Sequence, residues 1–467
     1  MPPMTKPSAR EIIDDFANEI RVKCLKTAKP SKEVIKFRDD YQSGRERDVL
    51  RVPIEILRYR KDNGRIASDV LDHERNIGVL DEKDNQAQEK IRKFLEEKDP
   101  ERTAVLKKAI MQDGQQEPAI ITCDGFLING NRRKMVMERL HHEHPDDERF
   151  AYMKVVILPG KGEEGGPPTL LEIEKIENRY QLQSDGKSEY YGFDRALSIK
   201  RKIELGFSLE EQLRDDPQFA GATKPQIDKA VREHAKNYLD PLDCVDRYLK
   251  QFGRDRLYRT ISTGMSDHEG RWQAFIDYSN TYNGCFKNPK KLIEYGIEEE
   301  EIGTIEEAAF HIIRLRTVPD MPKVHKIMRD LPKYCRTIEG KKAIKKISKE
   351  VEPILPREKC VKPNGEPLTV DEEDAKWAAS SMQPITYNVK KASRSHETKK
   401  EKETPVELLE AALKKLNHED MIVKSIADGD FERALKLAGK IKVRANELES
   451  EIYRCVKERK KLPHKKL

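Results

Sequence analysis

The most chemically suggestive stretch of this 467-residue chain is Gly130-Asn131-Arg132-Arg133, which stands where a helix is expected to begin. A helix N-terminus exposes backbone N–H groups and the positive end of the helix dipole, so it attracts anions. Gly130 allows a phosphate to approach the backbone, and the two arginines offer forked donors to the same anion. The sequence therefore predicts a phosphate site. The alternative is an ordinary strand-to-helix turn with two solvated arginines.

A second group of residues has the spacing of a helix-turn-helix motif. Ser208 with Glu211, and Thr223 with Gln226, predict the starts of two consecutive helices, the first over residues 209–214. Such a motif places its second helix in the major groove of DNA. The basic side chains available on that second helix are Lys224, Lys229, Arg232 and Lys236. A charged helical bundle with no nucleic-acid partner is the alternative.

Short strands and helices must position the phosphate candidate. Residues 118–122 and 126–128 predict two strands joined by an Asp124-Gly125 turn. The alternation of Val52, Ile54 and Ile56 predicts another strand over residues 52–57, and residues 154–158 predict a further buried one. Helices are expected over residues 9–21, 31–41, 85–97 and 102–112.

These motifs, taken in order, resemble a known family. Gly114-Gln115-Gln116-Glu117-Pro118, the turn, Gly130-Asn131-Arg132-Arg133 and Ile176-Glu177-Asn178-Arg179 are similar to the N-terminal domain of the ParB/sulfiredoxin superfamily. Residues 52–57 match the first strand of that domain, and the resemblance covers residues 50–240. It implies an α+β fold, in which a small ParB/sulfiredoxin-like mixed domain precedes a large all-helical region.

The resemblance also implies a nucleotide site. In ParB-type proteins the Gly-x-Arg-Arg helix start holds the phosphates of a cytidine nucleotide, which implies phosphate contacts from Gly130, Asn131, Arg132 and Arg133. A Glu-Asn pair holds magnesium in that family, so Glu177 and Asn178 become the implied metal ligands; Mg²⁺ prefers such oxygen donors. The implied cofactors are Mg²⁺ and a nucleoside triphosphate, CTP first. Sulfiredoxins carry their catalytic cysteine in the equivalent turn, where this chain has Asn131, and this disfavours sulfiredoxin chemistry.

Composition narrows the class of protein. Charged residues make up 37% of the chain but the net charge is only +6, so any nucleic-acid site must be a local patch. The sequence shows no apolar run of membrane-spanning length and no secretory signal. Its seven cysteines lack metal-binding spacing, which indicates reduced thiols in a cytoplasmic protein.

The expected organisation has six parts. They are an N-terminal helical arm (1–48), a ParB/sulfiredoxin-like domain (49–160), a helical part with the helix-turn-helix candidate (169–245), a helical domain (246–385), a Lys-, Glu- and Ser-rich linker (386–404) and a C-terminal helical unit with a basic tail (405–467).

The function expected from these features is a nucleotide-dependent, DNA-associated switch in segregation, regulation or defence, with nucleotide and DNA as partners and a homodimer as a candidate assembly. One alternative is an enzyme on the same scaffold, a CTPase-like hydrolase, phosphotransferase or nuclease, for which Glu117 is the nearest acidic candidate. The other is a helical interaction scaffold with a degenerate nucleotide site, which Asn131 permits.

Overall fold

The computed structural model describes residues 10–25, 30–98, 100–182, 192–262, 268–356, 360–362 and 365–461. The chain divides into two compact units, 1–396 and 397–467. The first unit holds a small four-stranded mixed sheet and most of the helices, so the fold is mostly helical α+β. No helix in the described part of the chain combines the length and apolar character needed to cross a membrane.

The sheet has the strand order β1-β2-β4-β3. Strand β2 (Arg47–Pro53) runs antiparallel to both β1 (Lys32–Glu33) and β4 (Tyr152–Ile157), whereas β3 (Ala119–Ile121) runs parallel to β4. Successive side chains of a strand point to opposite faces of its sheet. Accordingly Ile121 packs with one hydrophobic cluster and Ile120 with another.

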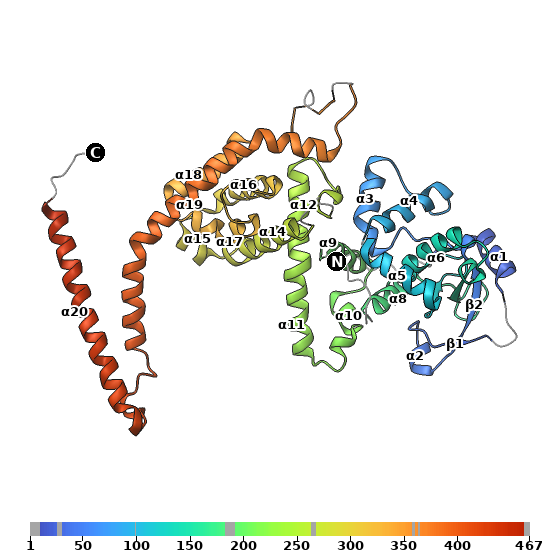
Figure 1. Ribbon diagram of the computed structural model, residues 1–467, viewed down its shortest axis with the longest axis horizontal. Coiled ribbons are helices and arrows are strands. Elements are labelled where there is room, and N and C mark those ends of the chain that lie inside the picture. The colour runs from blue at the N-terminus through green and yellow to red at the C-terminus, as the bar shows by residue number, and fades with distance from the viewer. Residues whose placement is uncertain are drawn as a thin grey trace. The chain divides into compact units, whose positions relative to one another are not determined.

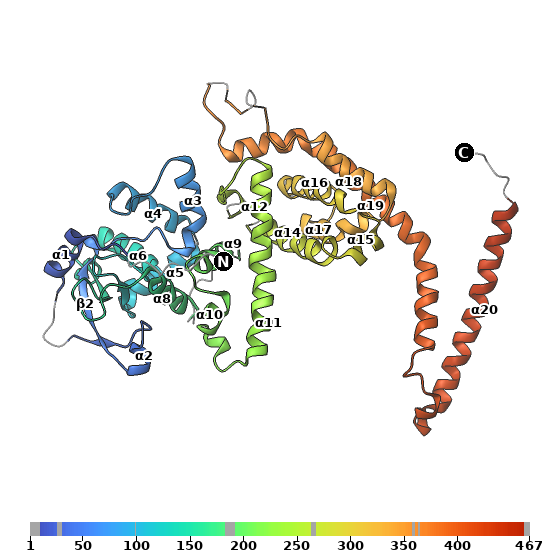
Figure 2. The same ribbon diagram turned by 180° about the vertical axis from the view of Figure 1, so that it is seen from behind.

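Helices cover both faces of this sheet (Figures 1 and 2). The cluster on one face draws its side chains from α4 (Asn85–Glu97) and α6 (Asn131–Glu143), including Ile91, Phe94 and Met135. The cluster on the other face includes Ile173 and Ile176 of α8 (Leu170–Leu182). The remaining helices around the sheet are α1 (Asp14–Lys23), α2 (Asp40–Ser43), α3 (Ala67–Asn76), α5 (Pro100–Asp113) and α7 (Glu148–Ala151).

A larger helical region follows, with its own aromatic core. Tyr248, Phe275, Phe310 and Trp377 are fully buried there. Its helices are α9 (Gly192–Glu204), α10 (Leu209–Arg214), α11 (Lys224–His234), α12 (Asp240–Gln251), α13 (Arg259–Ser262), α14 (His268–Thr281), α15 (Pro289–Tyr295), α16 (Ile302–Leu315), α17 (Val324–Tyr334), α18 (Ile338–Glu350) and the first part of α19 (Val370–Leu416). The last helix of the described residues is α20 (Phe431–Lys461).

Several expected elements are confirmed. Helix α4 has the expected bounds, α5 contains the expected helix over 102–112, and β4 covers most of 154–158. The expected helix over 9–21 forms in part as α1; residue 9 lies outside the described residues.

The expected helix over 31–41 is wrong, and so is a purely helical arm over 1–48. Lys32 and Glu33 form β1, which pairs with the start of β2. Ile35 and Phe37 are both buried beside the sheet, in a bend in which the Phe37 N–H donates to the Ile35 backbone oxygen at 2.9 Å. The N-terminal segment is therefore part of the sheet domain.

Two expected strands are shorter than the patterns suggested. After Val52 the chain leaves β2 at Pro53, and Ile54–Ile56 forms a 3₁₀ turn that still buries both isoleucines. The Asp124-Gly125 turn forms, but residues 126–128 return only as isolated bridges, because Leu127 pairs with Ile121 while Phe126 pairs with Arg58. Residues 126–128 therefore pair with two different segments, β3 and the chain at Arg58.

The expected linker over 386–404 is also wrong. Helix α19 runs through it without a break, from Val370 to Leu416 (Figure 1). Lysine and glutamate are good helix formers, and residues 386–404 contain no proline or glycine. Val389 and Ala392 are fully buried against the helical core, which holds the first part of this segment in place.

Candidate anion-binding pocket

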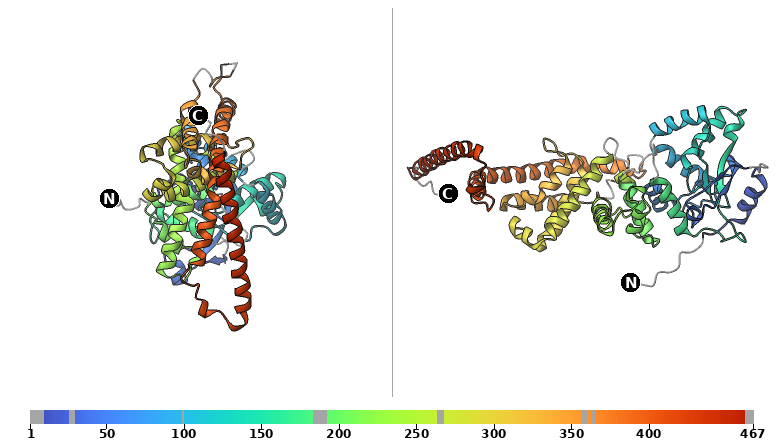
Figure 3. Two further views of the ribbon diagram at one scale, coloured as in Figure 1. Left: turned by 90° about the vertical axis from the view of Figure 1, so that its left-hand side faces the viewer. Right: turned by 90° about the horizontal axis from the view of Figure 1, so that it is seen from below.

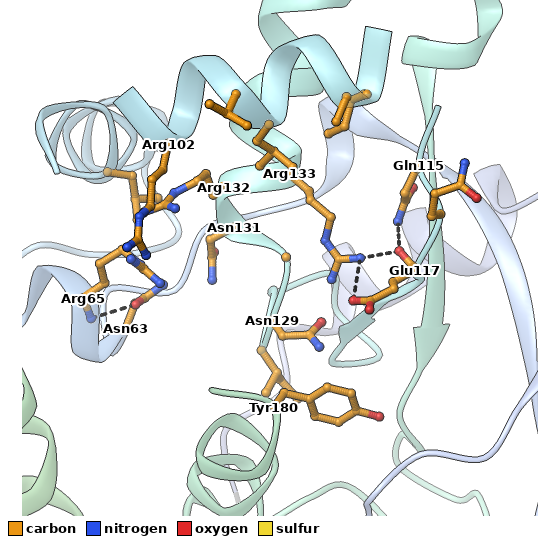
Figure 4. A pocket seen from close by; sticks show the side chains of 18 of the residues that line it. Asn63, Arg65, Arg102, Gln115, Glu117, Asn129, Asn131, Arg132, Arg133 and Tyr180 are labelled. Atoms are coloured by element: carbon orange, nitrogen blue, oxygen red, sulfur yellow. Dashed lines mark hydrogen bonds and ion pairs between the residues drawn. The ribbon is translucent and has the colours of Figure 1, made fainter. Parts of the chain in front are cut away.

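A cavity of about 610 Å³ lies beside the N-terminus of α6 (Figure 4). Helix α5, the segment that follows it, the start of α6, the turn around Asn63 and helix α8 all contribute walls. The lining residues are Asn63, Arg65, Leu95, Arg102, Val105, Leu106, Ala109, Ile110, Asp113, Gly114, Gln115, Gln116, Glu117, Ile128, Asn129, Gly130, Asn131, Arg132, Arg133, Glu177 and Tyr180. This volume lies within the usual range for small-molecule sites.

The start of α6 is fixed by Asn129 and Gly130. The Asn129 side-chain oxygen accepts a hydrogen bond from the Ile120 N–H at 2.7 Å, which ties the hairpin return to β3. Gly130 is the N-cap at φ 86°, and a Cβ there would lie 2.8 Å from the Ala119 Cβ. Glycine suits both the left-handed backbone and the close approach. It also has no side chain that could cap the first turn, and no side-chain cap forms there among the described residues.

Three arginines from different elements converge at one end of the pocket. Arg132 comes from α6, Arg102 from α5 and Arg65 from the 3₁₀ turn Gly64–Ile66, and Figure 4 shows them close together. Sequence reasoning found only Arg132 of this group. Arg65 and Arg102 carry no motif: Arg102 reaches the site through the packing of α5 beside α6, and Arg65 through its 3₁₀ turn, which packs against α4 and α9.

Arg133 points to the other end of the pocket and is already engaged (Figure 4). Its guanidinium donates to the Glu117 backbone oxygen and lies 3.9 Å from the Glu117 carboxylate. Burial lowers the pKa of Arg133. It therefore ties α6 to the segment after α5. Glu117 itself is 66% exposed and lies beside Arg133, away from the Arg65, Arg102 and Arg132 cluster, so the structure does not place it as a base there.

Asn131 lines the pocket and has a side-chain oxygen that makes no hydrogen bond to the part of the chain that the structure describes. The residue is 7% exposed, and among the described residues its side-chain oxygen has no hydrogen-bond partner. A buried polar atom without a partner is costly. The position that departs from the family pattern thus holds a buried polar atom whose hydrogen bond is not made within the described residues.

The pocket also has an apolar side. Val105, Leu106, Ala109 and Ile110 of α5, with Leu95 and Ile128, line one part of it, and Tyr180 of α8 adds an aromatic ring. Arginines at one end and apolar groups along a wall suit a ligand that is anionic at one end and has a ring or chain at the other.

The implied magnesium ligands do not fit a metal ion. The Glu177 carboxylate accepts from Arg60 at 3.0 Å and from the Gly64 N–H at 3.2 Å, and Glu174 lies 3.0 Å from the same guanidinium. Although burial acts to lower it, the charges of Glu177 and Glu174 raise the pKa of Arg60. A permanent cation already occupies the position beside these carboxylates.

Asn178 is likewise engaged, and it points elsewhere. Its side-chain oxygen accepts from the Lys202 ammonium at 3.0 Å, and its amide donates to the Gln212 backbone oxygen at 3.2 Å. Glu177 lines the pocket and Asn178 does not. Among the described residues, no group of three or more His, Cys, Asp or Glu side chains is placed to hold a metal ion. The expected Glu177–Asn178 magnesium site is therefore not formed here.

The helix-turn-helix candidate forms as two packed helices. Both expected capping boxes are present, at Ser208 and at Thr223. Leu209 and Leu213 of α10 pack with Ala230 of α11. The four basic residues of α11 and its extension, Lys224, Lys229, Arg232 and Lys236, lie on the surface. Helix α11, the π-helical segment Ala235–Leu239 and α12 continue as one unbroken helix (Figure 2).

Helix α8 joins the pocket to this pair of helices. Glu177 and Tyr180 line the pocket, whereas Asn178 and Arg179 bond to α10 and to the residue that follows it. The Arg179 guanidinium lies 3.2 Å from the Asp215 carboxylate. One helix therefore contacts both candidate sites through adjacent residues. Comparison of the chain with known protein families, curated protein sequences and solved structures finds no match.

Proposed function

We propose that this protein binds a nucleoside phosphate in the pocket beside α6 and uses it to control contact with DNA. The observation that carries the proposal is the convergence of Arg65, Arg102 and Arg132 at an uncapped helix N-terminus, inside a cavity with an apolar wall. Guanidinium groups and helix N-termini are the usual phosphate ligands of proteins. The apolar wall and Tyr180 would hold the base.

Phosphate charge in this pocket is balanced by arginine and not by a metal ion. The three arginines supply the positive charge at the ligand, and Arg60 neutralises Glu177 behind it. The ParB-like resemblance supports the position of the phosphate site. CTP remains the first nucleotide to test, and Mg²⁺ is not part of this proposal.

The switch would act through α8. A ligand that contacts Tyr180 or the Glu177 region changes the environment of a helix whose next residues hold α10. Binding shifts a conformational equilibrium only if the ligand interacts differently with the two states. A shift of α8 against α10 is such a difference, because it would alter the hydrogen bonds of Asn178 and Arg179.

Titration of labelled duplex DNA at several salt concentrations, with and without nucleotide, tests the DNA half of the proposal. Replacing Lys224, Lys229, Arg232 and Lys236 by alanine should weaken binding. The slope of log K against log salt should become shallower by about 0.9 for each DNA phosphate that the variant no longer neutralises. A charge-matched control replaces the lysines at 290, 326, 342 and 349 and should bind as wild type.

A second experiment tests the coupling between the nucleotide pocket and the DNA-binding helices. Nucleotide should change the DNA affinity of the wild type but not that of the Arg102→Ala/Arg132→Ala variant. Equal loss of DNA binding in the test variant and the control lysine variant would show that DNA does not bind specifically at α11. A DNA affinity that no nucleotide changes would leave a binding pocket without a switch, and the proposed coupling would be wrong.

A further inference from the structure

The second unit carries an apolar surface that nothing in its described residues covers. Sixteen of the thirty exposed large hydrophobic side chains of the described chain lie in residues 397–461, and none of the described residues of this unit is buried. Isolated helices depend on tertiary packing for most of their stability. These helices therefore need a partner surface.

Most of the apolar residues of α20 form a single broad stripe; Leu435 and Tyr453 lie beside it, and Val443 lies on the other side of the helix. Phe431, Leu437, Ile441, Leu448, Ile452 and Val456 recur along the helix, with Ala434, Ala438 and Ala445 between them. At 3.6 residues per turn they fall within about 120° of the helix circumference. Figure 3 shows α20 as one long helix, so the stripe continues over its length.

The end of α19 repeats the pattern. Val406, Leu409, Leu413 and Leu416 are spaced by three or four residues, and all four are exposed. A stripe this broad is typical of helices that contact two neighbours in a bundle, and a two-helix coiled coil needs only a narrower seam. One chain supplies two such helices. Two chains supply the four that a bundle requires.

The charges of α20 specify how two copies would pair. A basic stretch, Lys440, Lys442 and Arg444, is followed at once by an acidic stretch, Glu447, Glu449 and Glu451. Antiparallel pairing of two α20 helices about Ala445 places each basic stretch beside the acidic stretch of the other copy. Parallel pairing would place like charges together, which disfavours it. A two-fold interface must be self-complementary in this way.

We propose that two copies of this chain associate through residues 397–461, with their α20 helices antiparallel about Ala445, in a four-helix bundle. The small Ala434, Ala438 and Ala445 side chains allow the helices to approach closely there. This assembly depends on neither nucleotide nor DNA, so its test is independent of the proposed function.

The molar mass of the full-length protein in solution tests the proposal, measured by sedimentation equilibrium over a range of concentrations. Wild type should approach twice 54.2 kDa. Ile441→Glu changes a stripe residue and should raise the dimer dissociation constant at least tenfold. Val443→Glu changes a residue two positions along and about 200° around the helix, and it should dimerise as wild type.

Both substituted side chains are about half exposed in the single chain, so circular dichroism should show unchanged helix content in concentrated samples. A wild type that stays at 54.2 kDa would overturn the proposal, since the stripe would then be covered within one chain. Equal effects of Ile441→Glu and Val443→Glu would exclude the stripe as the interface.

A short bismaleimide cross-linker tests the helix direction. Antiparallel pairing about Ala445 separates the two Cys455 residues by about 30 Å but brings each opposite residue 435 of the other copy, about 1.5 Å along the axis from residue 434. Ala434→Cys should therefore give a covalent dimer that Ala434→Cys/Cys455→Ser does not. Cross-linking of wild type that disappears in Cys455→Ser would show parallel helices and refute the arrangement.

Discussion

Replacing Arg60 by methionine removes the buried cation that the structure places beside Glu174 and Glu177. The Arg60 guanidinium lies 3.0 Å from each carboxylate and donates to the Asp62 backbone oxygen at 2.8 Å. Methionine fills similar space but removes the nearest cation from two buried acids; Glu174 keeps Arg201 at 3.6 Å, and Glu177 keeps the Gly64 N–H. Breaking a buried ion pair by removing one partner costs about 3–5 kcal/mol.

The free energy needed to protonate one of these two glutamates at pH 7 is similar to this cost. A carboxyl group with an ordinary pKa of 4.5 needs about 3.4 kcal/mol to be neutral at pH 7, at 1.36 kcal/mol per pH unit. Burial, and then the charge of Glu177, already raise the pKa of Glu174 in the wild type. The folded variant should therefore bind about one proton more than its unfolded chain at pH 7.

This extra proton sets the sign of the pH dependence. Since the folded variant holds more protons than the unfolded chain, its stability falls as pH rises above the unfolded pKa. Its deficit relative to wild type should be about 3–5 kcal/mol at pH 7 and should shrink by about 1.4 kcal/mol per pH unit toward pH 5. Urea unfolding followed by circular dichroism at pH 5, 6 and 7 measures both quantities.

A matched control is Arg92→Met. Arg92 also bridges two glutamates, Glu89 and Glu96, but its side chain is 28% exposed and its partners are near the surface. Its loss should cost no more than about 1 kcal/mol. A deficit for Arg60→Met that matches this control, or that does not change with pH, would refute the buried-cation account. Rescue of Arg60→Met by Mg²⁺ would show instead that the carboxylates can hold a metal.

Two further changes test the site and the core. Gly130→Ala places a Cβ 2.8 Å from the Ala119 Cβ, at a residue with φ 86°. It should lower the free energy of unfolding in urea by about 1–3 kcal/mol and weaken nucleotide binding. Unchanged nucleotide affinity would show that the ligand does not bind at the start of α6. Burial lowers the pKa of His311 to about 4. Wild type should therefore lose up to about 3 kcal/mol of stability as pH falls from 6.5 to 4, while His311→Leu should show a flatter profile in that window.

Local signals in the sequence predicted the elements that local chemistry determines. The capping residues Ser208 and Thr223 located α10 and α11, and Asn129-Gly130 located the start of α6. These signals act over three or four residues, so no tertiary information was needed. The lysine and glutamate content of residues 386–404 was less informative, because such a composition is found both in solvated linkers and in exposed helices. The burial of Val389 favours the helix.

The features that sequence reasoning missed depend on packing between distant residues. Lys32 and Glu33 pair with the start of β2, and Ile35 and Phe37 are buried beside the sheet; these contacts overrode the helical pattern of 31–41. Arg102 reaches the pocket through the packing of α5 beside α6, and Arg65 through the packing of its 3₁₀ turn against α4 and α9. The Glu-Asn motif predicted a metal, but Arg60, more than a hundred residues earlier, neutralises Glu177.

The most direct test of the pocket is calorimetric titration of CTP, ATP and GTP into the protein, once with EDTA and once with Mg²⁺. We predict that one nucleotide binds wild type in EDTA, and that Arg132→Ala weakens it more than tenfold, since a hydrogen bond to a charged group contributes about 1.5–3 kcal/mol. Arg139→Ala, on the same helix but paired with Glu96, should leave the affinity unchanged. Binding that requires Mg²⁺, or no binding of any nucleotide, would contradict an arginine-built phosphate site.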